Sequence, residues 1–577
     1  MKTIYNKDLG FIPSVYQQAV FDFVKHGTGN AVVSAKAGSA KTTTMVAAMR
    51  MVHPSKRCLF IAFNKSIVEE LGKKVSGNTN CEVSTVHSLG LKMIERNLET
   101  CPTVDEYKYN TYLRKEADRK DVTIDKSIYF SNCLRLMELS RMNLCQTERE
   151  VLSICGRYGI SCVDDECKTV VSAMRWGSRN TQSVDYTDMV WLPYELGLSP
   201  KGLQYDWVFL DEGQDFSLAY VELVKKCFKR GTRMMAVLDE KQSINGFAGA
   251  CPEAVEMLKS FPHTITLDLP ICYRCDSNII RRAQRIVPGI QCRDNAPVGI
   301  VDDNAKLSDI REGDMVLSRY RAPLVKLYIA LGKMGVKCRM NGESGWEYVK
   351  DMVESCKETE VGGMFGKGIM AELYLKVLKE RNRISAVSGM DKRQASLSKQ
   401  IVSMFDTVSL IGDLSIECRN KEELLEKINS VFAEKNEGVL LSTVHKAKGL
   451  EADNVYIICP SSMPSVLAES DFDKSQEMNL IYVSITRAKH KLGYVSEDDF
   501  PLSGAAMKPD TIVGRMDFLE SVIKNIYGEK CIDIEYIIDN SRQKLQNAEE
   551  GKKENDTIST KQRDNMCSSK FSLSELD

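Results

Sequence analysis

Short runs of apolar residues recur along the chain, and each run ends in polar or small residues. In chain order they are NAVVSA from residue 30, RCLFIAF to Phe63, YDWVFLDE to Glu212, RMMAVLDE to Glu240, DMVLSR to Arg319, GVLLST to Thr443, NVYIICP to Pro460 and KLGYVS to Ser496. Such runs are typical of buried strands. Their alternation with helical stretches predicts an α/β fold with parallel sheets, in which ligands bind beyond the carboxyl ends of the strands.

Two stretches, 93–176 and 346–435, lack this pattern. Both are rich in Lys, Glu, Leu and Met, so we expect mostly helical insertions. Residues 541–577 are polar, with Phe571 as their one aromatic, and we expect them to be disordered. Their closing FSLSELD is either a peptide that binds a protein partner or part of a featureless tail.

Composition narrows the class of protein. A chain of 577 residues is too long for one core, and its net charge of -1 produces no overall basic field. The N-terminal MKTIYNKDLGF has no apolar signal region, and no run of about 18 apolar residues occurs. We therefore expect a cytoplasmic protein without membrane partners.

The 19 cysteines of such a chain are expected to be free thiols. Cys145, Cys155, Cys162 and Cys167 could together hold zinc or an iron–sulfur cluster, but their spacing contains no C-x-x-C pair. Free thiols are the interpretation that this spacing favours.

The stretch AKAGSAKTTT, residues 35–44, follows the first apolar run and precedes a helical pattern. It matches the phosphate-binding loop G-x-x-x-x-G-K-[ST] at Lys41 and Thr42, but Ala35 and Ala40 stand where both glycines are usual. A strand, a tight turn and a helix together point backbone N–H groups at an anion. The alternative is a structural turn. Alanine in a left-handed conformation would cost about 1–2 kcal/mol.

Polar residues that suit phosphate chemistry follow several later strands. Asp211 offers a hard oxygen ligand for Mg²⁺, and Glu212 can orient the attacking water. Gln214, Asp215 and Gln242 follow at strand ends, where phosphate oxygens could be sensed. Arg274 and Arg487 supply guanidinium groups for phosphate contacts, although any single arginine is more often a surface residue.

The order of these motifs resembles the superfamily 1 helicases of the UvrD/Rep/PcrA type. Seven segments between Gln17 and Val495 carry the resemblance: YQQAV, AFNKS, STVHS, DEGQD, DEKQSINGFAGA, VHKAKGLE and QEMNLIYVSITRAK. Any one segment is weak, but seven in the family's order make a chance match very improbable.

The resemblance implies two RecA-like P-loop motor domains with parallel sheets, each carrying a helical insertion. Motor 1A would comprise 1–92 and 177–272, with insertion 1B at 93–176. Motor 2A would comprise 273–345 and 436–530, with a reduced insertion 2B at 346–435.

The resemblance also implies roles in ATP hydrolysis. Lys41 would contact the β and γ phosphates, Thr42 and Asp211 would hold Mg²⁺, Glu212 would activate water and Gln242 would sense the γ phosphate. Arg274 and Arg487 would act as arginine fingers. Gln17, or alternatively Gln18, would read adenine, Glu451 would meet the ribose and Tyr482 would pack against the base. The implied nucleotide-binding set is Gln17, Ala35, Lys36, Ala37, Gly38, Ser39, Ala40, Lys41, Thr42, Thr43, Gly449, Glu451 and Tyr482.

The DNA-facing residues implied by the resemblance are Phe63, Asn64, Thr85, His87, Phe247 and His445. Aromatic platforms with backbone contacts are what single-strand binding requires, whereas core packing is the ordinary fate of a phenylalanine. Asn245 and Ala248 stand where the family often has an aromatic residue and an arginine, so stacking there would rest on Phe247.

The implied function is ATP- and Mg²⁺-dependent translocation on single-stranded DNA and unwinding of tailed duplex DNA, in replication, repair or recombination. HKAKGLE resembles the 3′→5′ branch, because the opposite branch has a serine–glutamine pair where Ala447 and Lys448 stand. The alternative is an ATP-gated remodeller that displaces proteins from DNA without unwinding. The small size and atypical loop favour a phage or viral source, which would place the protein in a host cytoplasm.

Overall fold

The computed structural model describes residues 11–62, 68–69, 72, 80–98, 101–120, 126–160, 162, 164–246, 249–341, 346–358, 361, 363–388, 390–432, 437–465, 468, 470–496, 509–529 and 532. Phe63, Asn64, Phe247 and the tail at 541–577 lie outside these described residues, so the predictions made for them stay predictions.

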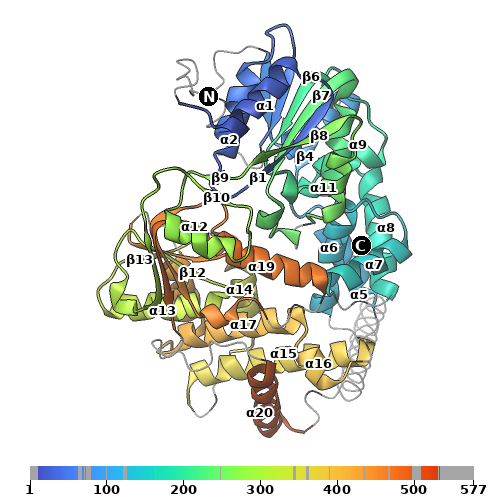
Figure 1. Ribbon diagram of the computed structural model, residues 1–577. Helices are drawn as coiled ribbons and strands as arrows, with labels where there is room; N and C mark the ends of the chain where they lie inside the picture. The colour runs from blue at the N-terminus through green and yellow to red at the C-terminus, as the bar shows by residue number, and fades with distance from the viewer. Residues whose placement is uncertain are drawn as a thin grey trace, which may run out of the picture.

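The first motor is built on a sheet of six parallel strands in the order β3-β2-β6-β7-β1-β8 (Figure 1). Its strands are β1 (Asn30–Ala35), β2 (Cys58–Ile61), β3 (Cys81–Ser84), β6 (Tyr205–Leu210), β7 (Phe228–Leu238) and β8 (Thr264–Leu269). Its helices are α1 (Val15–His26), α2 (Lys41–Arg50), α4 (Val86–Leu98), α9 (Tyr186–Glu195), α10 (Leu218–Lys226) and α11 (Pro252–Lys259).

Alternation along β1 shows why helices cover both faces of this sheet. Val32 packs in the cluster with α4, α9, α10 and α11, whereas Ala31 and Val33 pack in the cluster with α1 and α2. Successive strand side chains point to opposite faces, so a continuous apolar run buries both.

The second motor repeats this plan with a parallel sheet in the order β11-β16-β15-β12-β14-β13. Its strands are β11 (Ile300–Ala305), β12 (Met315–Ser318), β13 (Cys338–Met340), β14 (Val439–Thr443), β15 (Ala452–Ile458) and β16 (Ala488–Val495), and its helices are α12 (Ser277–Gln284), α13 (Arg321–Lys333) and α19 (Asp471–Ile485). Two parallel α/β sheets confirm the predicted fold class.

Both insertions are helical. The first contains α5 (Asn110–Asp118), α6 (Lys126–Met142), α7 (Glu148–Tyr158) and α8 (Asp164–Arg179), and the second contains α14 (Trp346–Glu354), α15 (Phe365–Ser388), α16 (Lys392–Ser396), α17 (Lys399–Ser415) and α18 (Lys421–Phe432). Minor elements are the parallel pairs β4 (Thr103–Val104) with β5 (Ser183–Val184) and β9 (Ile271–Cys272) with β10 (Gln291–Cys292), and the short helices η1 (Gly213–Asp215), η2 (Glu240–Gln242), η4 (Leu307–Asp309) and η5 (Pro460–Ser462).

The packed units differ from the expected domain limits. α4 runs through residue 93 and α8 through residue 176, so neither helix ends at a predicted boundary. The last described helix, α20 (Pro509–Tyr527), places Ile512, Met516 and Ile523 in the core of the second insertion instead of the second motor. The fully buried Arg381 of α15 also pairs with Glu520 of α20.

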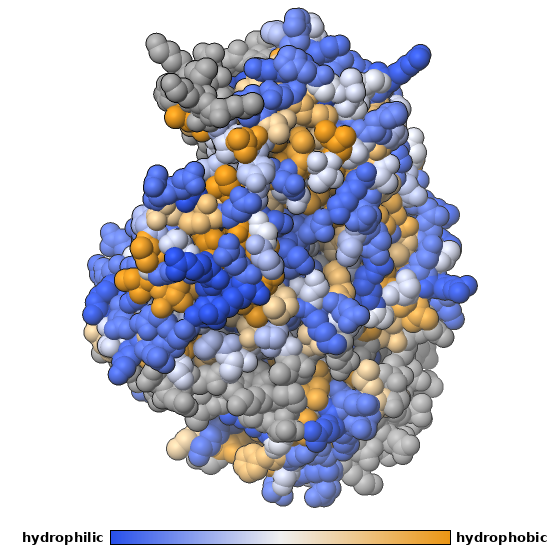
Figure 2. All heavy atoms as spheres, in the orientation of Figure 1, coloured by the Kyte–Doolittle hydropathy of each residue, from blue (hydrophilic) through white to orange (hydrophobic). Residues whose placement is uncertain are grey.

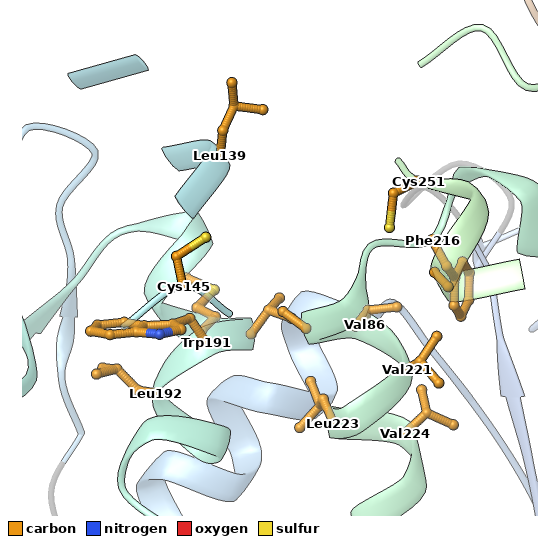
Figure 3. Packing of buried hydrophobic residues seen from close by; sticks show 14 of the residues in the cluster. Val86, Leu139, Cys145, Trp191, Leu192, Phe216, Val221, Leu223, Val224 and Cys251 are labelled. Atoms are coloured by element: carbon orange, nitrogen blue, oxygen red, sulfur yellow. The ribbon is translucent and has the colours of Figure 1, made fainter. Parts of the chain in front are cut away.

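The first insertion shares its core with the first motor. Figure 3 shows Trp191 and Leu192 of α9 near Cys145, with Val86 of α4 and Val221 of α10 in the same cluster. A buried ion network strengthens this junction. The Arg141 guanidinium donates to Asp185 at 2.8 Å and to Asp188 at 2.7 Å, and Lys108 Nζ lies 2.6 Å from Asp188.

One expectation about cysteine is wrong. Cys155 and Cys162 are joined in a disulfide, with 6.6 Å between their Cα atoms, so they are not both free thiols. The reason lies in the helix end: Gly159 adopts φ 63° after α7, and this left-handed residue turns the chain back on itself.

On the face shown in Figure 2, apolar residues lie in small groups among polar ones, as is usual for a protein surface. Within the part of the chain that the structure describes, no helix has both the length and the apolar character needed to cross a membrane.

Candidate nucleotide and DNA site

The loop between β1 and α2 has the backbone shape of an anion cradle. Gly38 and Ala40 both lie in the left-handed region, at φ 67° and 58°. A Cβ on Gly38 would lie 2.7 Å from Cys272 Sγ and 2.8 Å from Arg274 Cβ, so only glycine fits there. Ala40 precedes α2 without a side-chain cap. The N–H groups of the first helical turn therefore suit a phosphate.

Four predicted catalytic and metal-binding side chains converge beside this loop. Thr42 Oγ1 donates to Asp211 Oδ2 at 2.8 Å, and Lys41 Nζ lies 3.4 Å from Glu212 Oε1. Asp211 directly follows β6, and Glu212 comes next with φ 53°. The residues that sequence reasoning assigned to phosphate, metal and water are therefore neighbours in space.

The surroundings of Asp211 and Glu212 shift the pKa values of their carboxyl groups in opposite directions. Burial, with the charge of Glu212, raises the pKa of Asp211 to about 6. Burial would also raise the pKa of Glu212, but Lys41 and Lys448 lower it to about 2. Burial favours a neutral Lys41, yet the carboxylates of Glu212, Asp239 and Asp211 outweigh burial and raise its pKa. Glu212 is thus a fixed anion and Lys41 a fixed cation.

Thr42 and Asp211 also meet the requirements of Mg²⁺. Their adjacent hydroxyl and carboxylate oxygens are hard ligands, and Asp211 is 1% exposed. A buried carboxyl whose pKa is raised by burial and by a like charge is one that a divalent cation would stabilise in its ionised form. These residues therefore fit the metal that the sequence predicts.

A chain of amides connects Glu212 to Gln242. Gln214 donates from Nε2 to Glu212 and accepts at Oε1 from the Asp239 N–H at 2.9 Å. Gln242 Nε2 in turn donates to Asp239 Oδ2 at 2.6 Å. A phosphate near Glu212 would therefore act on an amide network that ends at the predicted sensor.

Arg487 approaches this network from the second motor. Its side chain is buried, with Nε donating to the Val483 carbonyl at 3.1 Å and a terminal nitrogen to the Leu450 carbonyl at 3.0 Å. Burial, together with the charge of Arg274, lowers its pKa to about 10. A buried cation held by neutral carbonyls favours an incoming anion.

Arg274 also reaches the loop from the second motor, because its Cβ lies beside Gly38. Its Nε lies 2.5 Å from Glu451 Oε2, and its guanidinium donates to the Thr486 carbonyl at 3.1 Å. Glu451, the predicted ribose contact, is thereby paired with Arg274 and also lies 3.3 Å from Lys489 Nζ. The structure thus brings both predicted arginine fingers near the first motor: Arg274 lies beside Gly38, and Arg487 is close enough for the charge of Glu212 to act on it.

Further contacts cross between the motors. The Ala37 N–H donates to the Tyr482 hydroxyl at 2.9 Å, and the Tyr273 N–H donates to the Gly38 carbonyl at 2.8 Å. Lys448 Nζ pairs with Asp215 and donates to the Gln242 carbonyl at 2.8 Å. The loop at 35–42 and the predicted sensor Gln242 are therefore both in contact with the second motor.

The predicted base-reading residues have structural contacts of their own. Gln17 accepts from the Ser14 N–H at 3.0 Å in a capping box and donates to Thr44 Oγ1 at 3.0 Å, which ties α1 to α2. Tyr482 is fully buried, and its hydroxyl contacts the phosphate loop. Gly449 has φ 87°, and a Cβ added to it would meet no atom within 4 Å. Their nucleotide roles stay predictions.

Sequence reasoning missed Tyr273, which stands in the same CYRC segment as Arg274. It is half-buried, and its backbone contacts the phosphate loop. Its adjacency to a recognised arginine was the signal that could have found it.

The predicted DNA residues that the structure describes lie in two places. Thr85 Oγ1 accepts from the Ser88 N–H at 3.1 Å at the start of α4. His87 lies edge-on to Tyr220 and Tyr186, with ring centroids 5.7 and 6.1 Å away. His445 follows β14 in the second motor, where burial and the charges of Arg319 and Arg321 lower its pKa to about 3. Sequence reasoning missed Tyr186 and Tyr220, because they lie 99 and 133 residues from His87 and nothing local in the sequence links them to it.

Comparison with known proteins finds related helicase domains in the N-terminal and C-terminal parts of the chain. Residues 17–262 match the model of the UvrD/REP helicase N-terminal domain, and residues 438–495 match that of the UvrD-like helicase C-terminal domain. The ATP-dependent DNA helicase PcrA of Staphylococcus aureus is 22% identical over 595 residues, covering 81% of each chain, and that of Staphylococcus epidermidis RP62A is 21% identical with the same coverage. The ATP-dependent DNA helicase PcrA of Leuconostoc citreum is 22% identical over 351 residues, covering 55% of this chain and 46% of its own length. Two matched domains, on the two motors that meet at the phosphate loop, show that the chain belongs to the UvrD/Rep family of helicases.

Proposed function

We propose that this chain is an ATP- and Mg²⁺-dependent DNA helicase that moves 3′→5′ on single-stranded DNA and unwinds 3′-tailed duplexes in replication, repair or recombination. The observation that supports it best is the approach of Arg274 and Arg487, from the second motor, to the buried carboxylates and phosphate loop of the first. ATP bound there would touch both motors at once.

The side chains divide the hydrolytic work among them. Lys41 and the first N–H groups of α2 bind phosphate oxygens, and Thr42 with Asp211 would hold the Mg²⁺ that neutralises phosphate charge. Glu212 is ionised, since Lys41 and Lys448 lower its pKa to about 2, and its carboxylate can orient the attacking water by accepting a hydrogen bond from it. Arg274 and Arg487 stabilise the charge that develops on the transferred phosphoryl group.

The same contacts couple hydrolysis to motion. Lys41 lies against Glu212 and Lys448 against Asp215, so an incoming phosphate would compete with Glu212 for Lys41 of the first motor and with Asp215 for Lys448 of the second motor. Binding then closes the two motors on ATP, and hydrolysis releases them. Tyr482 and the amide of Gln17 are the base contacts that we propose, with half-buried Tyr273 as a further one and with Gly449 and Glu451 near the ribose.

The proposed polarity rests on the segment that carries His445 and Lys448. Ala447 and Lys448 stand where the opposite branch has a serine–glutamine pair, and the relatives that align over 81% of the chain are named as DNA helicases. DNA would contact Thr85, His87 and His445, with Phe63, Asn64 and Phe247 in neighbouring segments. The C-terminal FSLSELD is a candidate protein-binding peptide.

Two variants test the site. Lys41→Ala removes the cation from the phosphate cradle, so both nucleotide binding and hydrolysis should nearly vanish. Glu212→Gln removes the water-activating carboxylate and leaves the cradle, so hydrolysis should nearly vanish while a fluorescent ATP analogue still binds. Near wild-type DNA-stimulated hydrolysis by either variant would contradict the assignment.

A third variant tests the contribution of the second motor. Arg487→Ala should lower turnover by about 10³-fold or more if the guanidinium meets the transition state. Arg282→Ala is the matched control, because Arg282 is a half-buried arginine of the second motor that pairs with Asp303 at 2.6 Å. Thermal unfolding of both variants separates catalysis from folding. A fall of only about twofold for Arg487→Ala would mean a structural arginine.

A further inference from the structure

Three cysteine sulfurs lie close together in the first insertion, which supplies none of the predicted nucleotide-binding residues. Cys155 lies in the last turn of α7, Cys167 in the first turns of α8 and Cys162 between the two helices. Their Sγ atoms all lie within 4.8 Å of one another, and Cys162 and Cys167 are 3.9 Å apart. We call these residues the sulfur trio.

The disulfide between Cys155 and Cys162 uses two of these sulfurs and leaves the third beside them. The separation of Cys162 and Cys167 suits a shared metal ion. Tetrahedral zinc with Zn–S bonds of about 2.3 Å places its sulfur ligands roughly 3.8 Å apart. A cytoplasmic thiol pool would keep such cysteines reduced.

We propose that the sulfur trio, in its reduced form, is a binding site for one thiophilic divalent cation of the Zn²⁺ class. Two electrons and two protons from a thiol reductant break the Cys155–Cys162 bond and give two thiols. Metal binding then displaces the protons of all three thiols, and three thiolates hold the ion. The disulfide and the metal are therefore mutually exclusive.

The three sulfur ligands differ in burial, so one side of the site faces the core and the other faces towards the surface. Cys155 and Cys167 are 5% and 2% exposed and belong to the shared core of the first motor and its insertion, whereas Cys162 is half-buried. Three protein ligands leave a fourth position for water or a small ligand, on the side of Cys162. Cys145 does not belong to the group, and Figure 3 shows it beside Trp191 in the core.

The bound ion would stiffen a contact with the motor. It would join the end of α7 to the start of α8, and Arg157, also in the last turn of α7, pairs with Glu253 of α11 at 2.7 Å. Metal occupancy would thus set how firmly this helical hairpin is held against the first motor.

The test uses the full chain, purified under a thiol reductant without chelator. Atomic emission should find about one Zn²⁺ per chain, and Co²⁺ exchange should give a sulfur-to-cobalt charge-transfer band. In a zinc buffer, Cys155→Ser, Cys162→Ser and Cys167→Ser should each weaken binding by about 10-fold or more. Cys145→Ser and the exposed Cys101→Ser are the matched controls and should bind as the unchanged chain does.

Titration of the unchanged reduced chain against a chelator keeps the test decisive if a variant fails to fold. Failure of that chain to bind Zn²⁺ or Co²⁺ would overturn the proposal. Equal loss of metal in Cys145→Ser would overturn it as well. Peptide mapping that finds the Cys155–Cys162 bond intact after reductant treatment, with no metal, would have the same consequence.

Discussion

At the scale of single residues, Ala40 shows how the loop forms although alanine stands where the usual motif has glycine. The loop keeps the left-handed conformation that glycine normally supplies, with φ 58° at alanine. The sequence predicted the loop from Lys41, Thr42 and the flanking strand and helix. It could not show that Gly38 must be a glycine, because the atoms that leave no room there for a side chain belong to Cys272 and Arg274, far away in the sequence.

Ala40→Gly should relieve about 1 kcal/mol of this strain, and nucleotide should bind as tightly as before or several-fold more tightly. Folding stability should change little, since glycine also adds freedom to the unfolded chain. Titration with a fluorescent ATP analogue measures the binding.

The control for this change is Ala37→Gly. Ala37 is buried and is not among the described residues with positive φ, so glycine there relieves no strain and should only destabilise the protein. Loss of nucleotide binding in Ala40→Gly would show that the loop has a different shape.

His445 is the second residue whose chemistry depends on its surroundings. Burial and two arginines hold its pKa at about 3, which keeps the imidazole neutral, so we expect the proposed DNA contact to rest on packing or hydrogen bonding instead of positive charge. His445→Ala should weaken single-strand binding by about 1 kcal/mol, and by the same factor near pH 6 and near pH 8. An ordinary histidine would become a cation at the lower pH and lose more.

Fluorescence anisotropy with labelled single-stranded DNA measures this effect. His53→Ala, at an exposed position of the first motor, serves as control and should bind equally at both values. A loss that grows as the pH falls would mean that His445 is protonated when DNA binds.

At the scale of elements, the strands were predictable and the attachment of α20 was not. Continuous apolar runs such as Val32 and Val33 in β1 admit few solutions other than a buried parallel strand. The apolar stripe of α20 fits any apolar surface, and sequence reasoning placed it with the second motor. The structure places it on α15, because Arg381 needs a carboxylate and Glu520 supplies one.

This attachment should depend on acidity. Burial opposes the charge of Glu520, but Arg381, Lys524 and Lys392 lower its pKa to about 2, below the ordinary 4.5. A carboxyl with a lowered pKa stabilises the folded state above about pH 4.5, and this stability is lost as the pH falls towards 2. Glu520→Gln should therefore destabilise the second insertion near neutral pH, by about 3 kcal/mol, and progressively less in acid.

Urea denaturation followed by circular dichroism, near pH 7 and near pH 3, measures this difference. Glu529→Gln is the control, since Glu529 is 84% exposed and lies 3.9 Å from Lys524. Equal destabilisation by Glu520→Gln at both values would contradict the ionic role.

At the scale of the whole molecule, the order of motifs predicted two motors, but their interface followed only from the structure. The pairs Lys448–Asp215 and Ala37–Tyr482 join segments more than 230 residues apart. No local pattern specifies such partners. Lys448, which donates to the Gln242 carbonyl, is three residues from His445 in sequence, so the predicted γ-phosphate sensor of the first motor touches the segment of the second motor that we propose contacts DNA.

Direction of movement is the last consequence of this arrangement. Closure of the same cleft drives either direction, and the segments that grip the strand at each step decide which one results. His445 and Lys448 lie in a segment that resembles the 3′→5′ branch, so we predict unwinding of a duplex with a 3′ single-stranded tail, in the presence of ATP and Mg²⁺. The measurement is strand displacement from two duplexes of equal length, one with a 3′ tail and one with a 5′ tail, with Glu212→Gln as the inactive control. Unwinding of the 5′-tailed duplex alone would reverse the polarity. Unwinding of neither, with hydrolysis intact, would favour a remodeller that displaces proteins without separating strands.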